Sequence, residues 1–162
     1  MNVLRAKPDV RLYLLSSFHD TPRMVTSDRA EIVYADNPTT ISNCISTTGA
    51  LGHAIEEQAL IIDTLEGAVV ITGCAHPGIV RIVEKARELI EAEIMLVMGG
   101  FHLKSNSEGE IGSIIYQLKE LGVKNVGPSH CTGDTAIAAF ERAFKERFIQ
   151  LGTGNTIDPL KL

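Results

Sequence analysis

The spacing of apolar and polar positions changes part-way along the chain. In the first part, short runs rich in β-branched residues predict strands over residues 10–15, 31–35, 40–46, 58–63 and 67–72. Only three residues separate the last two runs, which is short enough for a hairpin. The beginning of the chain is therefore expected to be rich in β-structure.

From residue 77 onward, apolar residues recur with the spacing of amphipathic helices, and compact apolar runs separate these stretches. The helical patterns cover residues 77–91, 110–121 and 133–146, and the intervening strand patterns cover residues 94–98, 124–127 and 148–151. Pro77 suits a first helical position, Gly122 suits a helix stop, and Thr132 suits an N-cap. The expected class is α/β, with a β-α-β-α-β-α-β order in the C-terminal two-thirds.

Three of the five histidines stand immediately after predicted strands. They are His76 in residues 73–78 (GCAHPG), His102 in residues 99–102 (GGFH) and His130 in residues 128–133 (PSHCTG). If the three strands run parallel in one sheet, their C-terminal ends form the edge where α/β proteins bind ligands. Imidazole is a common zinc ligand, and a catalytic zinc usually has three protein ligands. The pattern therefore predicts a metal site at this edge.

Each histidine also has an ordinary structural interpretation. His76 could bond a loop carbonyl, His102 could face substrate, and His130 could order the start of the following helix. The two remaining histidines are interpreted as solvent-facing: His53 in a glycine-rich turn, and His19 beside an aspartate in a polar loop. The repeated strand-to-loop placement is what favours a functional site for the first three.

The cysteines suggest two other sites, and both are disfavoured. The HCT sequence at Cys131 superficially resembles a cysteine-phosphatase loop, but Ile137 stands where the arginine should be and Asp134 would repel phosphate. Cys74 and Cys131 could join two of the histidines in a closed structural zinc site. The C-x-H and H-C spacings are poor for such a site.

Composition limits the classes of partner. The 162 residues suit a single domain, and the net charge of −5 with no tryptophan disfavours nucleic acid as a partner. No apolar run approaches the roughly 20 residues that span a bilayer, and the N-terminus has no signal-peptide pattern. Three widely spaced cysteines suit reduced thiols, so a cytoplasmic location is expected.

The three histidine motifs, in this order, resemble the C-terminal half of the metallo-β-lactamase superfamily. The nearest branch comprises the archaeal and bacterial metal-dependent hydrolases of β-lactamase superfamily II, which includes dihydropterin-methyl–ribofuranosylaminobenzene 5′-phosphate synthases. The resemblance implies an αββα sandwich holding one or two metal ions, usually zinc. It also implies metal ligands at His76 and His130. His102 stands where many relatives have a bridging aspartate, so it is either a ligand or a substrate contact.

The chain departs from the family in one large respect. The leading metal motif, HxHxDH, is not found in the sequence, which contains no HxH. Residues 1–162 are therefore expected to form one domain that corresponds to an incomplete αββα sandwich lacking that segment. A metal would bind weakly or partially, and a complementing N-terminal half or a homo-oligomer would be needed for full activity.

Two functional hypotheses follow from the resemblance. In the first, the chain is hydrolase-like, or like the pterin–ribofuranosylaminobenzene-phosphate transferases, and acts on a small and potentially phosphorylated molecule. In the second, it is a non-catalytic pseudoenzyme or assembly module of the same fold. A weaker third option is a phosphate-binding protein that uses the helix N-termini near Pro77 and Thr132.

Overall fold

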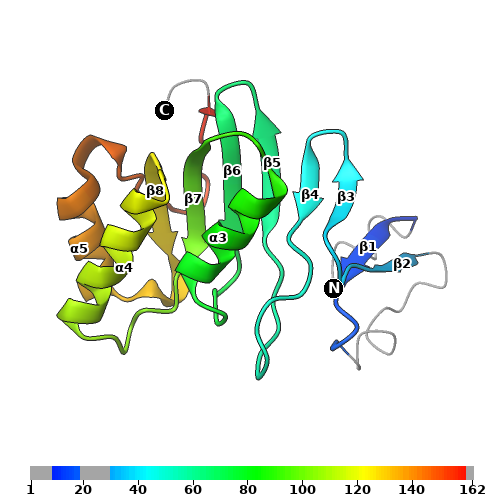
Figure 1. The fold of residues 1–162 in the computed structure, drawn as a ribbon, viewed down its shortest axis with the longest axis horizontal. Coiled ribbons are helices and arrows are strands. Elements are labelled where there is room, and N and C mark those ends of the chain that lie inside the picture. Colours follow the sequence, from blue (N-terminus) through cyan, green and yellow to red (C-terminus); the bar gives the residue numbers. More distant parts are fainter. Residues whose placement is uncertain (1–8, 19–29, 160–162) are drawn as a thin grey trace.

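The computed structural model describes residues 9–18 and 30–159, and its largest element is a six-stranded mixed sheet (Figure 1). The strands lie in chain order: β3 (Thr39–Ser42), β4 (Ile45–Thr47), β5 (Leu60–Thr64), β6 (Gly67–Thr72), β7 (Ile94–Gly100) and β8 (Asn125–Ser129). Strands β3 to β6 pair antiparallel, whereas β6, β7 and β8 pair parallel. The predicted parallel arrangement of the three histidine-bearing strands is therefore confirmed. A separate parallel pair is formed by β1 (Arg11–Leu14) and β2 (Glu31–Tyr34).

Three described helices cover one face of the sheet, and the first two form the crossovers from β6 to β7 and from β7 to β8 (Figure 1). They are α3 (Ile79–Leu89), α4 (Glu108–Glu120) and α5 (Asp134–Phe144). Apolar residues from all three helices join residues of β5 to β8 in one buried cluster, which includes Ile82, Leu118 and Phe140. This single core holds the C-terminal strand ends in a fixed arrangement.

The opposite face of the sheet is less completely covered. Strand register aligns Leu60, Ile71 and Met98 in one row and Ile62, Val69 and Leu96 in the next. Val69 and Leu96 are buried, but Ile71 and Met98 are only half-buried and Leu60 is exposed. A partly exposed apolar surface therefore runs across the middle of this face.

Two predicted strands differ from the structure. Residues 40–46 are not one strand, because the chain turns at Asn43 and Cys44 so that β3 and β4 pair with each other. The predicted last strand is only a single bridge between Phe148 and Val126. The predicted order therefore ends at α5, with one bridge in place of a seventh element.

Two predicted helix starts are also wrong. Helix α3 begins at Ile79, because Gly78 has a φ of 99° that is incompatible with a helix, so Pro77 lies outside it. Helix α5 is preceded by Gly133, and the Thr132 hydroxyl is engaged elsewhere. By contrast, Gly122 follows α4 with a φ of 79°, as expected for a helix stop. His19 and the aspartate beside it lie outside the described residues.

Candidate metal centre

The loops that follow β6, β7 and β8 are joined directly to one another. The amide of Gly100 donates to the carbonyl of Gly73 at 2.9 Å, and the hydroxyl of Thr72 donates to the carbonyl of Gly100 at 2.9 Å. The buried Thr132 hydroxyl accepts from the amide of Phe101 at 3.0 Å and donates to the carbonyl of Ser129 at 2.6 Å. Thr132 thus links two histidine loops rather than capping α5.

Backbone strain is concentrated in the same loops. Of the four described non-glycine residues with positive φ, three are Ala75 at 61°, His102 at 52° and His130 at 53°. A left-handed conformation costs a non-glycine residue on the order of 1–2 kcal/mol. Such strain tends to persist at functional sites, where the surrounding structure holds it in place.

A carboxylate orients the first of the three histidines. Nδ1 of His76 is hydrogen-bonded to Oε1 of Glu57, and Oε2 of Glu57 accepts from the amide of Ala75 at 2.7 Å. The His76 and Glu57 side chains are only 25% and 17% exposed. A carboxylate at Nδ1 favours the tautomer with its proton there, so Nε2 keeps the lone pair that can bind a metal.

The second histidine lies against the first. The rings of His76 and His102 have centroids 4.3 Å apart and an interplanar angle of 50°. Both rings line an open cleft of about 420 Å³ that also contains Asn106 and Gln117. The buried Phe101 packs edge-on against Phe140 at 5.3 Å and anchors the loop that carries His102.

The third histidine lies with the two cysteines. The potential ligand atoms of Cys74, His130 and Cys131 all lie within 4.8 Å of one another. A second group with the same spacing contains Glu57, Cys74 and His76, so the two groups share Cys74. In the part of the chain that is described, the three predicted histidines do not themselves form one group of this kind.

The shared cysteine has an altered acidity. Partial burial raises the pKa of the Cys74 thiol, and its proximity to Cys131 and to Glu57 raises it further. The free thiol is therefore favoured at Cys74 when no cation is nearby. Its neighbour Cys131 donates from Sγ to the carbonyl of Cys74 at 3.3 Å.

Sequence reasoning missed Glu57 and underestimated the cysteines. Glu57 lies in an irregular segment, where its backbone bonds to Leu51 at 2.8 and 2.9 Å, and no local motif marks it. The C-x-H and H-C spacings disfavoured a site at Cys74 and Cys131 because each spacing lies within one segment. The fold brings the two loops together across parallel strands, so spacing within one segment does not limit the site.

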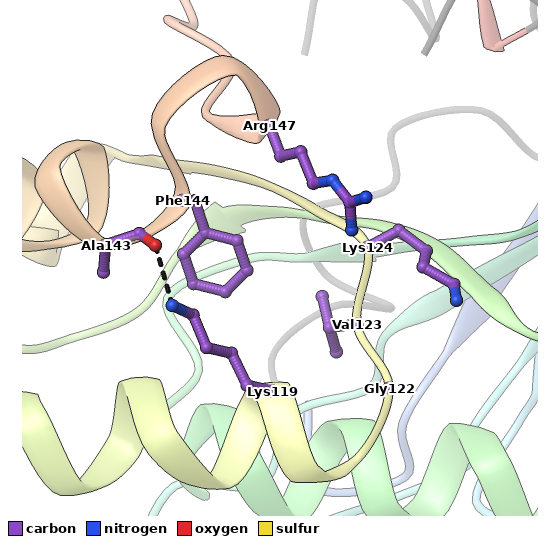
Figure 2. Close-up of a pocket in the computed structure, with 7 residues that line it drawn as sticks. All are labelled: Lys119, Gly122, Val123, Lys124, Ala143, Phe144 and Arg147. Atoms are coloured by element: carbon purple, nitrogen blue, oxygen red, sulfur yellow. Dashed lines mark hydrogen bonds between the residues drawn. The ribbon is translucent and has the colours of Figure 1, made fainter.

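A second cleft lies at the opposite end of β8 and is lined by basic side chains (Figure 2). Lys119, Lys124 and Arg147 surround Phe144 there. Lys119 donates to the carbonyl of Ala143 at 2.7 Å and lies 5.1 Å from the Phe144 ring centroid. Because these contacts join α4 to α5, we interpret the cleft as a result of helix packing. None of the three histidines lines it.

The chain resembles metal-dependent hydrolases in structure. It aligns with Tm1679, a metal-dependent hydrolase of the β-lactamase superfamily, with a TM-score of 0.79 and 28% identity, over 91% of this chain and 70% of that one. The chain has a metallo-β-lactamase-like fold. The predicted fold class is thereby confirmed.

Curated relatives agree with the structural match. The chain is 40% identical over 108 residues to the 7,8-dihydropterin-6-methyl-4-(beta-D-ribofuranosyl)-aminobenzene-5'-phosphate synthase of Methanocaldococcus jannaschii. It is 39% identical over 69 residues to the uncharacterized protein MJ0448 of the same organism. These alignments cover 66% and 43% of this chain but 37% and 26% of the relatives, so they span about a third of the relatives' length. No family model matches the chain.

The donor atoms present at the strand edge suit a metal ion. Imidazole, thiolate and carboxylate groups are the protein ligands of zinc, and all three types converge here. Nδ1 of His76 is hydrogen-bonded to a carboxylate. In metal-binding histidines, the ring nitrogen that does not bind the metal usually makes such a hydrogen bond. Among the described helices, none has the length and apolar character needed to cross a membrane.

Proposed function

We propose that the chain carries part of the active site of a metal-dependent hydrolase or group-transfer enzyme that acts on a small molecule. The observation that carries this proposal is the Glu57-oriented His76, with the His102 ring beside it on an open cleft. The superfamily match supports a metal, and we propose that the metal is zinc. The name of the curated relative supports a phosphate-bearing substrate.

In this proposal the three histidines have separate roles. His76 holds a metal through Nε2, and Glu57, by accepting from Nδ1–H, fixes the tautomer and the orientation of the neutral ring. His130 holds a metal at the next loop, and His102 either completes the ligand set or contacts substrate. A bound zinc ion lowers the pKa of a water molecule toward about 7 and polarises the bond to be broken.

We further propose that residues 1–162 are one domain corresponding to the C-terminal half of the αββα sandwich. The sequence contains no HxHxDH motif, the leading metal motif of the superfamily that the chain resembles. Further ligands would then come from a complementing N-terminal half or from a second copy of the chain. The partly exposed apolar sheet face provides a surface for such an association.

Zinc binding tests the metal site directly. Zinc stoichiometry and affinity would be measured for the wild-type chain and for His76→Ala and His130→Ala, with His53→Ala as a matched control. His53 is exposed and lies outside the three loops, so its substitution should change nothing. The proposal predicts weaker zinc binding in both site variants. A folded wild-type chain that binds no zinc at micromolar concentration would overturn it.

Turnover separates the two functional hypotheses. The zinc-loaded chain would be assayed with a chromogenic phosphate ester, alone and with a polypeptide that carries an HxHxDH half-sandwich. Zinc-dependent hydrolysis that disappears in His76→Ala supports an enzyme. Zinc binding without hydrolysis in either assay supports the alternative of a pseudoenzyme or assembly module.

A further inference from the structure

We propose that Cys74 and Cys131 bind a soft divalent cation, such as zinc, together with His130, through two thiolates and one imidazole. This inference deepens the proposed function, because His130 belongs to both. It assigns the cysteines a role that the histidine motifs alone do not suggest. It also assigns the metal at this loop a sulfur-rich ligand set.

The three donor atoms are already close enough for one ion. They all lie within 4.8 Å of one another. In a tetrahedral zinc site, bonds of about 2.3 Å to sulfur and about 2.0 Å to nitrogen place the ligand atoms roughly 3.5 Å apart. Small side-chain rotations therefore suffice to close the site around an ion. Two cysteines and one histidine also form a known catalytic zinc ligand set, with a fourth position left open.

The backbone holds the two cysteine loops together independently of any ion. Gly100 lies between them, and a Cβ at that position would stand 2.5 Å from the carbonyl oxygen of Gly73 and 2.9 Å from Sγ of Cys131. Only glycine permits this approach. The buried Thr132 then fixes the short helix η1 (His130–Thr132) through its two hydrogen bonds.

The surroundings of the two thiols leave their sulfur atoms available to a cation. The Sγ–H of Cys131 makes only a weak hydrogen bond, to the Cys74 carbonyl at 3.3 Å. Both cysteines are half-buried and His130 is exposed, which gives an ion access from solvent. Binding releases two protons to solvent, and the two thiolates balance the charge of the dication. Thiolates select zinc or cadmium over magnesium.

Cadmium and zinc titrations of the reduced, full-length chain test the inference. Cadmium bound to thiolate has a charge-transfer absorption in the ultraviolet, whereas cadmium bound to imidazole and carboxylate alone does not. We expect this absorption in the wild type and in Cys44→Ser, and a clear reduction in Cys131→Ser, which leaves Cys74 as the one thiolate. Cys44 is an exposed cysteine on the β3–β4 turn, outside both ligand groups, so it is the matched control.

Thiol reactivity provides a second measurement that needs no variant. Zinc should slow the reaction of two of the three thiols with a disulfide reagent and leave the third, Cys44, unchanged. Equal reactivity of all three thiols with and without zinc would overturn the inference. So would oxidation of Cys74 and Cys131 to a disulfide by the same reagent in saturating zinc, because the thiols would then be a redox pair. This test stands even if Cys131→Ser does not fold.

The outcomes distinguish this inference from the proposed function. If cadmium binds without thiolate absorption, and zinc binding is weakened by His76→Ala, the thiolate site is wrong and the proposed function stands. If the folded wild-type chain binds neither ion, both proposals fail. If thiolate absorption survives His76→Ala but is lost in His130→Ala, the thiolate site is supported as a distinct centre.

Discussion

At the scale of single residues, the site depends on contacts between side chains that are distant in the sequence. Glu57 and His76 are 19 positions apart, yet the carboxylate bonds both the imidazole of His76 and the amide of Ala75. One acidic side chain thus fixes both the ring and the strained residue before it. Its contribution should appear in metal affinity as well as in stability.

Replacement of Glu57 by glutamine tests this orientation. The glutamine oxygen can still accept from the Ala75 amide, so its NH₂ group faces Nδ1 of His76 and favours the tautomer with its proton on Nε2. That tautomer has no lone pair for a metal, and zinc affinity should fall by about 10- to 100-fold. Competition with a chromophoric chelator would measure the zinc affinity of the wild type and of Glu57→Gln. Unchanged affinity in a folded Glu57→Gln chain would show that Glu57 does not position His76.

At the scale of elements, the site is set by where strands and helices end. Helix α4 starts with a capping box, in which Ser107 and Glu110 satisfy each other's backbone amides. This start fixes the length of the loop that leads from His102 to α4. At the end of β7, Gly100 permits the close approach of two neighbouring loops.

The capping box should make stability depend on pH. Hydrogen bonds from the backbone and side chain of Ser107 lower the pKa of Glu110. Because the folded pKa lies below the unfolded value of about 4.3, the stabilisation is complete above that value and is lost as pH falls through the folded pKa. Glutamine retains the cap but does not titrate, so Glu110→Gln should lose less stability on acidification. Denaturation midpoints of the wild type and of Glu110→Gln would be measured between neutral and acidic pH. An equal fall of both midpoints with pH would contradict the prediction.

A methyl group at Gly100 should separate the loops. Gly100→Ala forces a Cβ against the Gly73 carbonyl and the Cys131 sulfur, at a cost of about 1–3 kcal/mol in the free energy of unfolding. The matched control is Gly112→Ala in the exposed interior of α4, where nothing lies within 4 Å of the added Cβ. The control should stabilise the chain by about 0.5–1 kcal/mol. Denaturant unfolding would measure the free energy of unfolding of both variants. Equal changes in the two variants would show that the loops do not approach closely at Gly100.

At the scale of the whole molecule, the two faces of the sheet differ. One face is covered by α3, α4 and α5 and forms the buried core. The other carries the apolar rows that include Ile71 and Met98 in half-buried positions. An apolar surface of this kind favours association, which agrees with the proposed incomplete sandwich.

A charge on the second face should reduce any association that uses it. Ile71→Lys places an ammonium group in the middle of that face, and sedimentation should show a lower average mass than for the wild type at the same concentration. The control is Leu65→Lys in the β5–β6 turn, where the leucine is 96% exposed and lies off the face. If both substitutions act alike, the apolar rows are not the association surface.

The sequence by itself determined the type and order of the main elements and the sheet edge at which the three histidines lie. Helical spacing identified α3, α4 and α5, and the buried runs identified β6, β7 and β8. These signals are local, because apolar periodicity reflects which side of an element faces the core. The same local pattern showed that three histidines come after strands. Their motifs carry the family resemblance, which the structural match supports.

Only the tertiary structure decided which side chains meet. Glu57 reaches His76 from an irregular segment, and Cys74 lies beside Cys131 because parallel strands bring distant loops to one edge. The exact helix starts also depended on three dimensions, since Gly78 adopts a positive φ and the Thr132 hydroxyl bonds a neighbouring loop. Residues 40–46 fold back on themselves, so that β3 pairs with β4 and β4 pairs with β5. Pairing and proximity are properties of the packed chain, and no local pattern encodes them.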